Sequence, residues 1–195
     1  KFAKKAVEAG VDAIVAEGFE AGGHNGREET TTMCLVPLLR KHVSIPIIAA
    51  GGIGTGSGML AVMALGADGV QIGSRFIASP ESSAHQNFKE FILNSKEGDT
   101  QLILKEITPV RMLKNDFYNQ LIEAYENGAS KEKLISILGR GRAKQGMFMG
   151  DLSEGELEIG QVSALIDTIK PAAKIVLEII EEFYLAKNKI LEMKF

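Results

Sequence analysis

The stretch "IPIIAAGGIGTGSG", residues 45–58, places a short apolar run directly before a cluster of glycines. An apolar run of this length without polar alternation is typical of a buried strand. Glycines that follow a strand permit a tight turn and let the backbone approach an anion closely. Residues 58–66 then have the pattern of a helix that ends at Gly66. The stretch therefore predicts a strand–loop–helix unit, from which parallel α/β sheets are built.

The segments on either side continue the same alternation. Residues 2–9 predict a helix ending at Gly10, residues 11–18 a buried strand, and residues 31–43 a helix with threonines as candidate N-caps and Pro37 in it. Residues 68–76, "DGVQIGSRF", predict a third strand. Because the predicted strands are apolar throughout, we expect a parallel sheet that is covered on both faces.

The second half of the chain has a different pattern. We expect a helix over 79–98, a strand or extended linker over 99–107, a basic and mostly helical segment over 110–149, and a loop leading into a helix over 150–166. Residues 170–191 predict a terminal helix whose apolar residues form one docking face. The predicted division is 1–98 for the sheet region, 99–149 for a small helical domain and 150–195 for segments that return to the sheet.

Composition and charge exclude several classes of function. The 195 residues carry a net charge of −3, which argues against nucleic acid as the main partner. No apolar run approaches the roughly 18 residues that a membrane span needs, and no Cys/His/Asp cluster has the spacing of a metal site. The single cysteine, Cys34, excludes an internal disulfide framework and suits the cytoplasm. Cys34 lies in an apolar run, so we expect it to be buried.

Three glycine-rich loops follow the three predicted strands: "GFEAGGHNG", "GGIGTGSG" and "GSRF". Since parallel strands end at the same edge of a sheet, these loops are expected to cluster. The last two suit a phosphate group, with Ser74 and Arg75 beside them. In a (β/α)₈ barrel the loops after the last two strands often bind phosphate. The strands would then be the last three of a barrel whose first five lie upstream of Lys1. The alternative is that the glycines only make tight turns.

His24 lies between Gly22, Gly23 and Gly26, which cannot bury it. Histidine side chains transfer protons near neutral pH, so we predict a catalytic role for His24. His42 lies at the end of the helix predicted over 31–43 and suits a C-terminal dipole partner, and His85 receives no chemical role. The chain has no initial Met and begins inside a predicted helix, so we interpret it as a piece of a longer protein.

The segments "EAGGHNG", "IPIIAAGGI", "DGVQIGSRF", "SPESSAH", "GMFMGDLSEGELEIGQVSALI" and "IKPAAKIVLEII" together resemble the nitronate monooxygenase (2-nitropropane dioxygenase) family. Relatives in that family work as FMN-dependent enoyl-[acyl-carrier-protein] reductases. The resemblance covers nearly the whole chain. It implies the C-terminal part of an FMN-binding (β/α)₈ TIM barrel, with a small helical excursion near the C-terminus.

The resemblance also implies roles for individual residues. The family's catalytic histidine corresponds to His24, and its flavin contacts to Glu17 (often Gln in relatives), Gly22 and Gly23. Its phosphate contacts correspond to Gly51, Gly52, Gln71, Ile72, Gly73 and Ser74, where many relatives have Thr at the last position. Gln161 is expected to close over the flavin. The stretch "NGREETTT" departs from the family in its extra charges, and we interpret Arg27, Glu28 and Glu29 as a solvated rim.

Three functions remain open from the sequence. The first is oxidation of alkyl nitronates with O₂, with FMN as the redox group and His24 as base or substrate-positioning residue. The second is an FMN-dependent enoyl-[acyl-carrier-protein] reductase that uses NAD(P)H. A basic segment would then either receive an acidic carrier protein or be a solvated face; its residues are Arg111, Lys114, Arg140, Arg142 and Lys144. The third is an incomplete barrel, inactive alone because its sheet edges are open. A homodimer is compatible with the apolar terminal helix.

Overall fold

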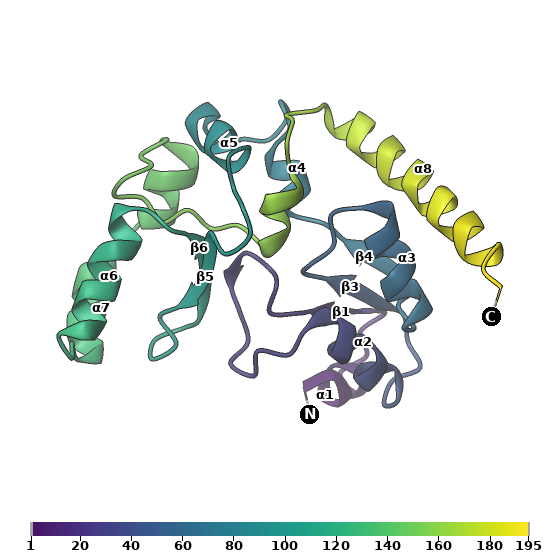
Figure 1. The fold of residues 1–195 in the computed structure, drawn as a ribbon. Coiled ribbons are helices and arrows are strands. Elements are labelled where there is room, and N and C mark those ends of the chain that lie inside the picture. Colours follow the sequence, from purple (N-terminus) through teal and green to yellow (C-terminus); the bar gives the residue numbers. More distant parts are fainter. Residues whose placement is uncertain (1, 195) are drawn as a thin grey trace.

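A computed structural model describes residues 2–194 and has an α/β fold (Figure 1). Its main sheet is parallel, with the strands β1 (Ile14–Glu17), β3 (Ile47–Ala50) and β4 (Gly69–Gln71) in that order. The helices α1 (Phe2–Glu8), α2 (Thr32–Arg40) and α3 (Gly56–Ala64) alternate with these strands. The predicted alternation is confirmed. Residues 2–194 form an open sheet rather than a closed barrel.

Local sequence signals account for the ends of these helices. Thr31 is the N-cap of α2 and accepts a hydrogen bond from the Cys34 N–H, and Thr55 caps α3 through the Gly58 N–H at 3.1 Å. Gly10 and Gly66 have φ angles of +83° and +108° just after α1 and α3, a region that favours glycine. The predicted threonine N-cap of α2 and the predicted glycine ends of α1 and α3 therefore agree with the structure.

A second, antiparallel sheet corrects the prediction for residues 110–149. It has the order β2 (Gly23–His24), β6 (Val110–Leu113) and β5 (Thr100–Ile103). All four residues of β6 are buried, so this segment is a core strand and not a helix. Helix α6 (Asp116–Glu126), helix α7 (Lys131–Leu138) and a π-helical turn (Lys144–Phe148) follow it. Residues 99–107 contain a strand rather than only a linker.

Other segments are shorter or different from what the sequence predicted. The helix expected over 79–98 is only α5 (Gln86–Ile92), and the predicted strand 68–76 ends at Gln71 before the one-turn helix α4 (Ser74–Ile77). His85 is the N-cap of α5, where its ring accepts a hydrogen bond from the Asn87 N–H. A 3₁₀ helix (Gln161–Leu165) precedes the long terminal helix α8 (Ala172–Leu191).

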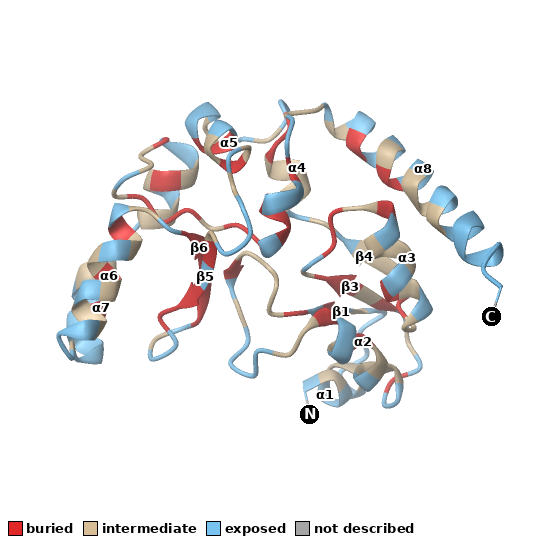
Figure 2. Ribbon diagram, viewed as in Figure 1, coloured by how far each residue is buried: buried red, intermediate tan, exposed pale blue. Residues whose placement is uncertain are grey.

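Burial is uneven, as Figure 2 shows. The central strand β3 is mostly buried, but Val15 on β1 is 50% exposed, so the expectation of a sheet covered on both faces is wrong for β1. Cys34 is exposed, which contradicts its predicted burial, because its position on α2 faces away from the core residue Val36. On α8, Ile175 and Ile179 are buried while other apolar residues of the helix are exposed. None of the helices in residues 2–194 has the length and apolarity to cross a bilayer.

Candidate active site

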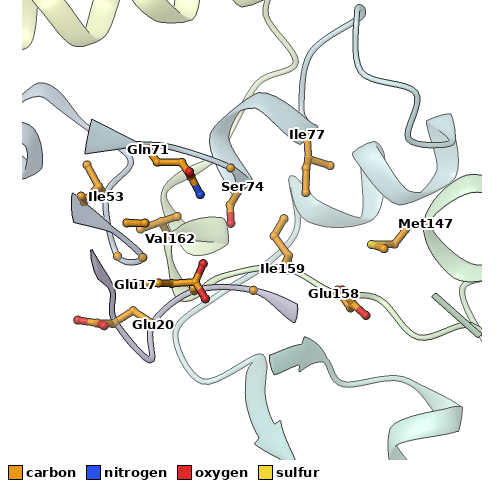
Figure 3. A pocket seen from close by; sticks show the side chains of 16 residues that line it. Glu17, Glu20, Ile53, Gln71, Ser74, Ile77, Met147, Glu158, Ile159 and Val162 are labelled. Atoms are coloured by element: carbon orange, nitrogen blue, oxygen red, sulfur yellow. The ribbon is translucent and has the colours of Figure 1, made fainter. Parts of the chain in front are cut away.

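A cavity of about 320 Å³ lies where the three parallel strands end (Figure 3). On the side of the parallel sheet, the cavity is lined by the ends of β1, β3 and β4 and by the segments that follow them. These residues are Glu17, Glu20, Ala21, Gly22, Ala50, Gly51, Gly52, Ile53, Gln71, Gly73, Ser74 and Ile77. The opposite wall comes from the second half of the chain: Met147, Glu158, Ile159 and Val162. The glycine-rich loops therefore cluster at one edge of the sheet, as the sequence predicted.

Glycine is required at several positions around this cavity. Gly51 and Gly52 have φ angles of +84° and +72°. A Cβ on Gly51 would lie 2.6 Å from the Gly18 carbonyl oxygen, and a Cβ on Gly22 would lie 2.4 Å from the backbone of Ile159. At Gly73, by contrast, an added Cβ would meet no atom within 4 Å. The backbone is thus packed closely around Gly22 and lies open to the cavity at Gly73.

Two features expected at the phosphate site are engaged elsewhere. The Gly56 N–H at the start of α3 donates to the Glu182 carboxylate of α8 at 2.8 Å. Arg75 forms an ion pair with Glu178 of α8 at 3.3 Å and does not line the cavity. The Gly56 N–H and the Arg75 side chain are therefore engaged by α8, and Arg75 does not lie beside a phosphate site as the sequence suggested.

The remaining groups fit a flat ring system with a phosphate group. Among the described residues, the backbone N–H groups of Gly52 and Gly73 donate to no other residue, and Ser74 presents a hydroxyl that accepts from the Gly160 N–H at 2.9 Å. Apolar side chains of Ile53, Ile159 and neighbouring residues offer contact to a ring. None of the described lining residues is Lys, Arg or His, so backbone donors would have to hold the anion.

The cavity is also lined by three glutamates, Glu17, Glu20 and Glu158, whose carboxyl groups have different surroundings. Glu20 is engaged, since its carboxylate accepts hydrogen bonds from the Thr32 backbone N–H at 3.0 and 3.1 Å. Burial raises the pKa of Glu17, which favours its neutral form. In Figure 3, Glu17 and Glu158 lie toward opposite ends of the cavity, with Ile159 between them. The acidic groups are therefore spread over the cavity and not gathered in one cluster.

His24 lines a second cavity of about 230 Å³, together with Arg142, Glu156 and Glu158. Glu158 belongs to the walls of both cavities. The second sheet brings these residues together, because His24 pairs with Val110 of β6 and Glu158 forms a bridge to Met112 of the same strand. A Cβ on Gly23 would lie only 2.7 Å from a Glu158 carboxylate oxygen, so glycine at this position gives Glu158 its place beside His24.

Other predicted site residues lie outside the first cavity. Ile72 packs against the core beneath the parallel sheet, and Gly23 lies behind the cavity against Glu158. Gln161 lines a separate cavity of about 490 Å³ that also contains Glu20 and Gly52. Gln161 is therefore near the predicted ring site without lining it.

The loop that carries His24 is fastened to the second sheet. Arg111 is buried, and its Nε and Nη2 donate to the Phe19 carbonyl at 3.0 and 2.9 Å while its guanidinium stacks on the Phe19 ring. Arg27 donates to the carbonyls of Lys105 and Ile107, and Glu29 forms an ion pair with Lys105. Arg27, Glu28 and Glu29 are exposed, as expected of a solvated rim, and Arg27 and Glu29 also make loop contacts.

The basic segment is only partly available to a partner. Arg111 is buried under the loop, and Arg142 donates to the Glu154 carboxylate at 3.0 Å and stacks on Phe117. The exposed members of the segment are Lys114, Arg140 and Lys144. The predicted five-residue basic surface is therefore reduced to three exposed side chains.

The sequence prediction missed Glu156 and Glu158. The signal was present in "ELEIG", where glutamates alternate with Leu157 and Ile159. Such alternation is typical of an extended segment with one buried apolar face. In the structure Leu157 and Ile159 are buried in the core, while the two glutamates line the His24 cavity.

Comparison with known proteins agrees with this geometry. Residues 1–182 match the Nitronate monooxygenase family. The chain belongs to the nitronate monooxygenase family. A "Probable nitronate monooxygenase" of Staphylococcus aureus is 37% identical over 96% of the chain and 54% of that protein. A protein of the same name from Staphylococcus saprophyticus is 37% identical over 81% of the chain and 47% of that protein.

Two solved structures are similar to this chain. FabK from Thermotoga maritima superposes with a TM-score of 0.86 and 40% identity, covering 96% of the chain and 59% of FabK. Nitroalkane oxidase from Streptomyces ansochromogenes has a TM-score of 0.76 and 30% identity, covering 96% of the chain and 56% of the oxidase. The chain thus spans about half the length of the curated relatives that it matches.

Proposed function

We propose that the protein is an FMN-dependent oxidoreductase that oxidises alkyl nitronates with O₂. The observation that carries this proposal is the pair of adjoining cavities, one formed by the glycine-rich ends of the parallel strands and the other containing His24. The cavity of about 320 Å³ falls within the range of roughly 300–1,000 Å³ usual for ligand sites. The family and its curated relatives support the same chemistry.

The FMN phosphate would be held by the backbone at Gly51, Gly52 and Gly73 and by the Ser74 hydroxyl. Glu17, Gly22 and Gln71 would lie along the ring system. Glu17 lines this cavity at the end of β1, where its carboxyl group can meet the ring. Bound FMN would supply the redox chemistry, accepting electrons from the substrate and passing them to O₂.

His24 would act on the substrate. Its side chain is exposed on β2, at the rim of the cavity that shares Glu158 with the ring site. A neutral imidazole nitrogen there can accept the proton α to a nitro group, and an imidazolium N–H can hold a nitronate oxygen by a hydrogen bond. The loop contacts of Arg111 and Arg27 would keep His24 in place.

An enoyl-[acyl-carrier-protein] reductase that uses NAD(P)H is the second candidate. The specific observation in its favour is the 40% identity with FabK, higher than the 30% with nitroalkane oxidase. The exposed Lys114, Arg140 and Lys144 would then meet an acidic carrier protein. Their small number makes this surface a weak argument alone.

An anaerobic absorption spectrum of the purified, flavin-loaded protein separates these candidates. Bleaching of the oxidised flavin by an alkyl nitronate, but not by NADPH, is expected for the monooxygenase. Rapid bleaching by NADPH would favour the reductase. Absence of a flavin band after addition of FMN would support the third possibility, that this chain alone is an incomplete barrel. His24→Ala is expected to retain the flavin band and lose turnover.

A further inference from the structure

Glu156 stands out among the buried polar residues. It is 6% exposed, and its carboxyl group makes no hydrogen bond or ion pair with another described residue. Its side chain lines the His24 cavity, whose other walls are largely apolar, including Leu104, Val110 and Leu138. The Glu156 carboxyl oxygens are not among the fully buried atoms that lack a hydrogen-bond partner, so they reach the open space of this cavity. A carboxyl group that shares a largely apolar cavity with a histidine can hold or release a proton there.

Three backbone segments bring Glu156 and Glu158 to His24. Leu157 and Ile159 turn into the core, so the two glutamates emerge on the same side of the chain. Glu158 bridges to Met112 on one edge of β6, and His24 pairs with Val110 of that strand on β2. His24 and Glu158 are thus both paired with β6, and Glu156 lies two residues before Glu158.

Few charged side chains line the His24 cavity. Its lining contains His24 from β2, Arg142 from the segment after α7, and the two glutamates. Arg142 is engaged by the Glu154 carboxylate and by the carbonyls of Ile137 and Leu138. Burial raises the pKa of Glu156 to about 7, the charge of Glu158 adds to that rise, and Arg142 opposes it. Burial also raises the pKa of Glu158, while His24 opposes that rise.

We propose that Glu156 and Glu158 act as one proton-holding pair that faces His24. The pair keeps a single proton, so one negative charge remains to balance the imidazolium that forms when His24 takes a proton from the substrate. Glu156 holds the proton that the pair keeps, and Glu158 is the ionised positioning residue next to His24. The proton that His24 has taken then passes from the imidazolium to the Glu158 carboxylate or to water, and no electrons move in this step. The proposal rests on the proposed role of His24.

Infrared spectroscopy of the flavin-loaded protein tests the pair without measuring activity. The carbonyl band of a protonated carboxyl group is expected near neutral pH, with a titration midpoint of about 7. Glu156→Gln should remove this band, while Glu28→Gln should leave it unchanged, because Glu28 is an exposed carboxylate on the His24 loop outside both cavities. Wild-type protein without the band, or a band that persists in Glu156→Gln, overturns the proton store.

The pH profile of kcat/KM tests the link to His24. In Glu158→Gln the imidazolium loses its balancing charge, so the acidic limb should move to lower pH by about 0.5–1 unit. Glu28→Gln is the control for the general effect of removing one negative charge. If His24→Ala abolishes turnover but Glu158→Gln leaves the limb unmoved, the pair is refuted and the proposed function stands. If His24→Ala leaves turnover intact, the proposed function itself fails. The flavin spectrum confirms that each variant retains its site.

Discussion

Replacing Gly22 by alanine tests how closely the His24 loop packs against the segment before the 3₁₀ helix. An added Cβ would lie 2.4 Å from the Ile159 carbonyl carbon and 2.5 Å from the Gly160 nitrogen. Both are backbone atoms, so no side-chain rotation can relieve the contact. The loop or the 159–160 backbone has to move, and both form part of the first cavity.

The expected cost follows from the nature of this contact. Overpacking a close-packed site costs typically about 1–3 kcal/mol, and a backbone neighbour places Gly22→Ala in the upper part of that range. For a chain of this size, each kcal/mol lowers Tm by about 2–4 °C. Gly22→Ala should therefore lower Tm by about 4–12 °C.

Gly73→Ala is the matched control, because Gly73 lines the same cavity and an added Cβ there meets no atom within 4 Å. Its φ of −103° is accessible to alanine, so its Tm should stay within about 2 °C of the parent protein. Thermal unfolding followed by circular dichroism, without added flavin, makes the comparison. If Gly22→Ala melts like Gly73→Ala, the close approach between the His24 loop and Ile159 is refuted.

Two further substitutions and a change of pH test other features of the site. Arg111→Leu leaves the partly buried carbonyl of Phe19 without its two donors, so urea unfolding should show a loss of about 1–3 kcal/mol and limited proteolysis should cut the His24 loop faster. Thr32→Val removes the hydroxyl that donates to the Gly51 carbonyl at 2.8 Å, and urea unfolding should show a similar loss. The free energy of unfolding should fall as pH rises from 4.5 to about 7, because folded Glu156 keeps a proton that the unfolded chain releases. Urea titrations across this range should show a smaller fall in Glu156→Gln.

Much of the first cavity was predictable because its signals are local. A short apolar run followed by glycines predicted β3 and its loop, and the same reasoning predicted β1 and β4. Parallel strands end at one edge, so the topology alone predicted that the loops meet. The resemblance to the family then named Glu17 and Ser74, which the structure places in the cavity wall. Their roles toward FMN stay predictions.

The second sheet was not predictable in the same way. Residues 110–111 pair with residues 23–24, far away in the sequence, and no local pattern encodes that pairing. Arg111 was grouped with the other basic residues of segment 110–149, whereas its environment is set by Phe19 and Thr100. Glu156 and Glu158 carried a local signal in their alternation with apolar residues. Their chemical interest depends on His24, which only the folded chain brings near.

The arrangement of the two sheets has a consequence for how the site works. The parallel sheet supplies the glycine-rich cradle, while the position of His24 depends on β6, since β2 pairs with no other strand within residues 2–194. The loop between cradle and histidine is held near its start, where Thr32 bonds to Glu20 and Arg111 bonds to the adjacent residue Phe19. A shift of the second sheet would therefore move His24 relative to the cradle and leave the cradle intact. Binding of a ring and transfer of a proton are thus assigned to separate parts of the fold, and substitutions in β6 should affect turnover more than flavin affinity.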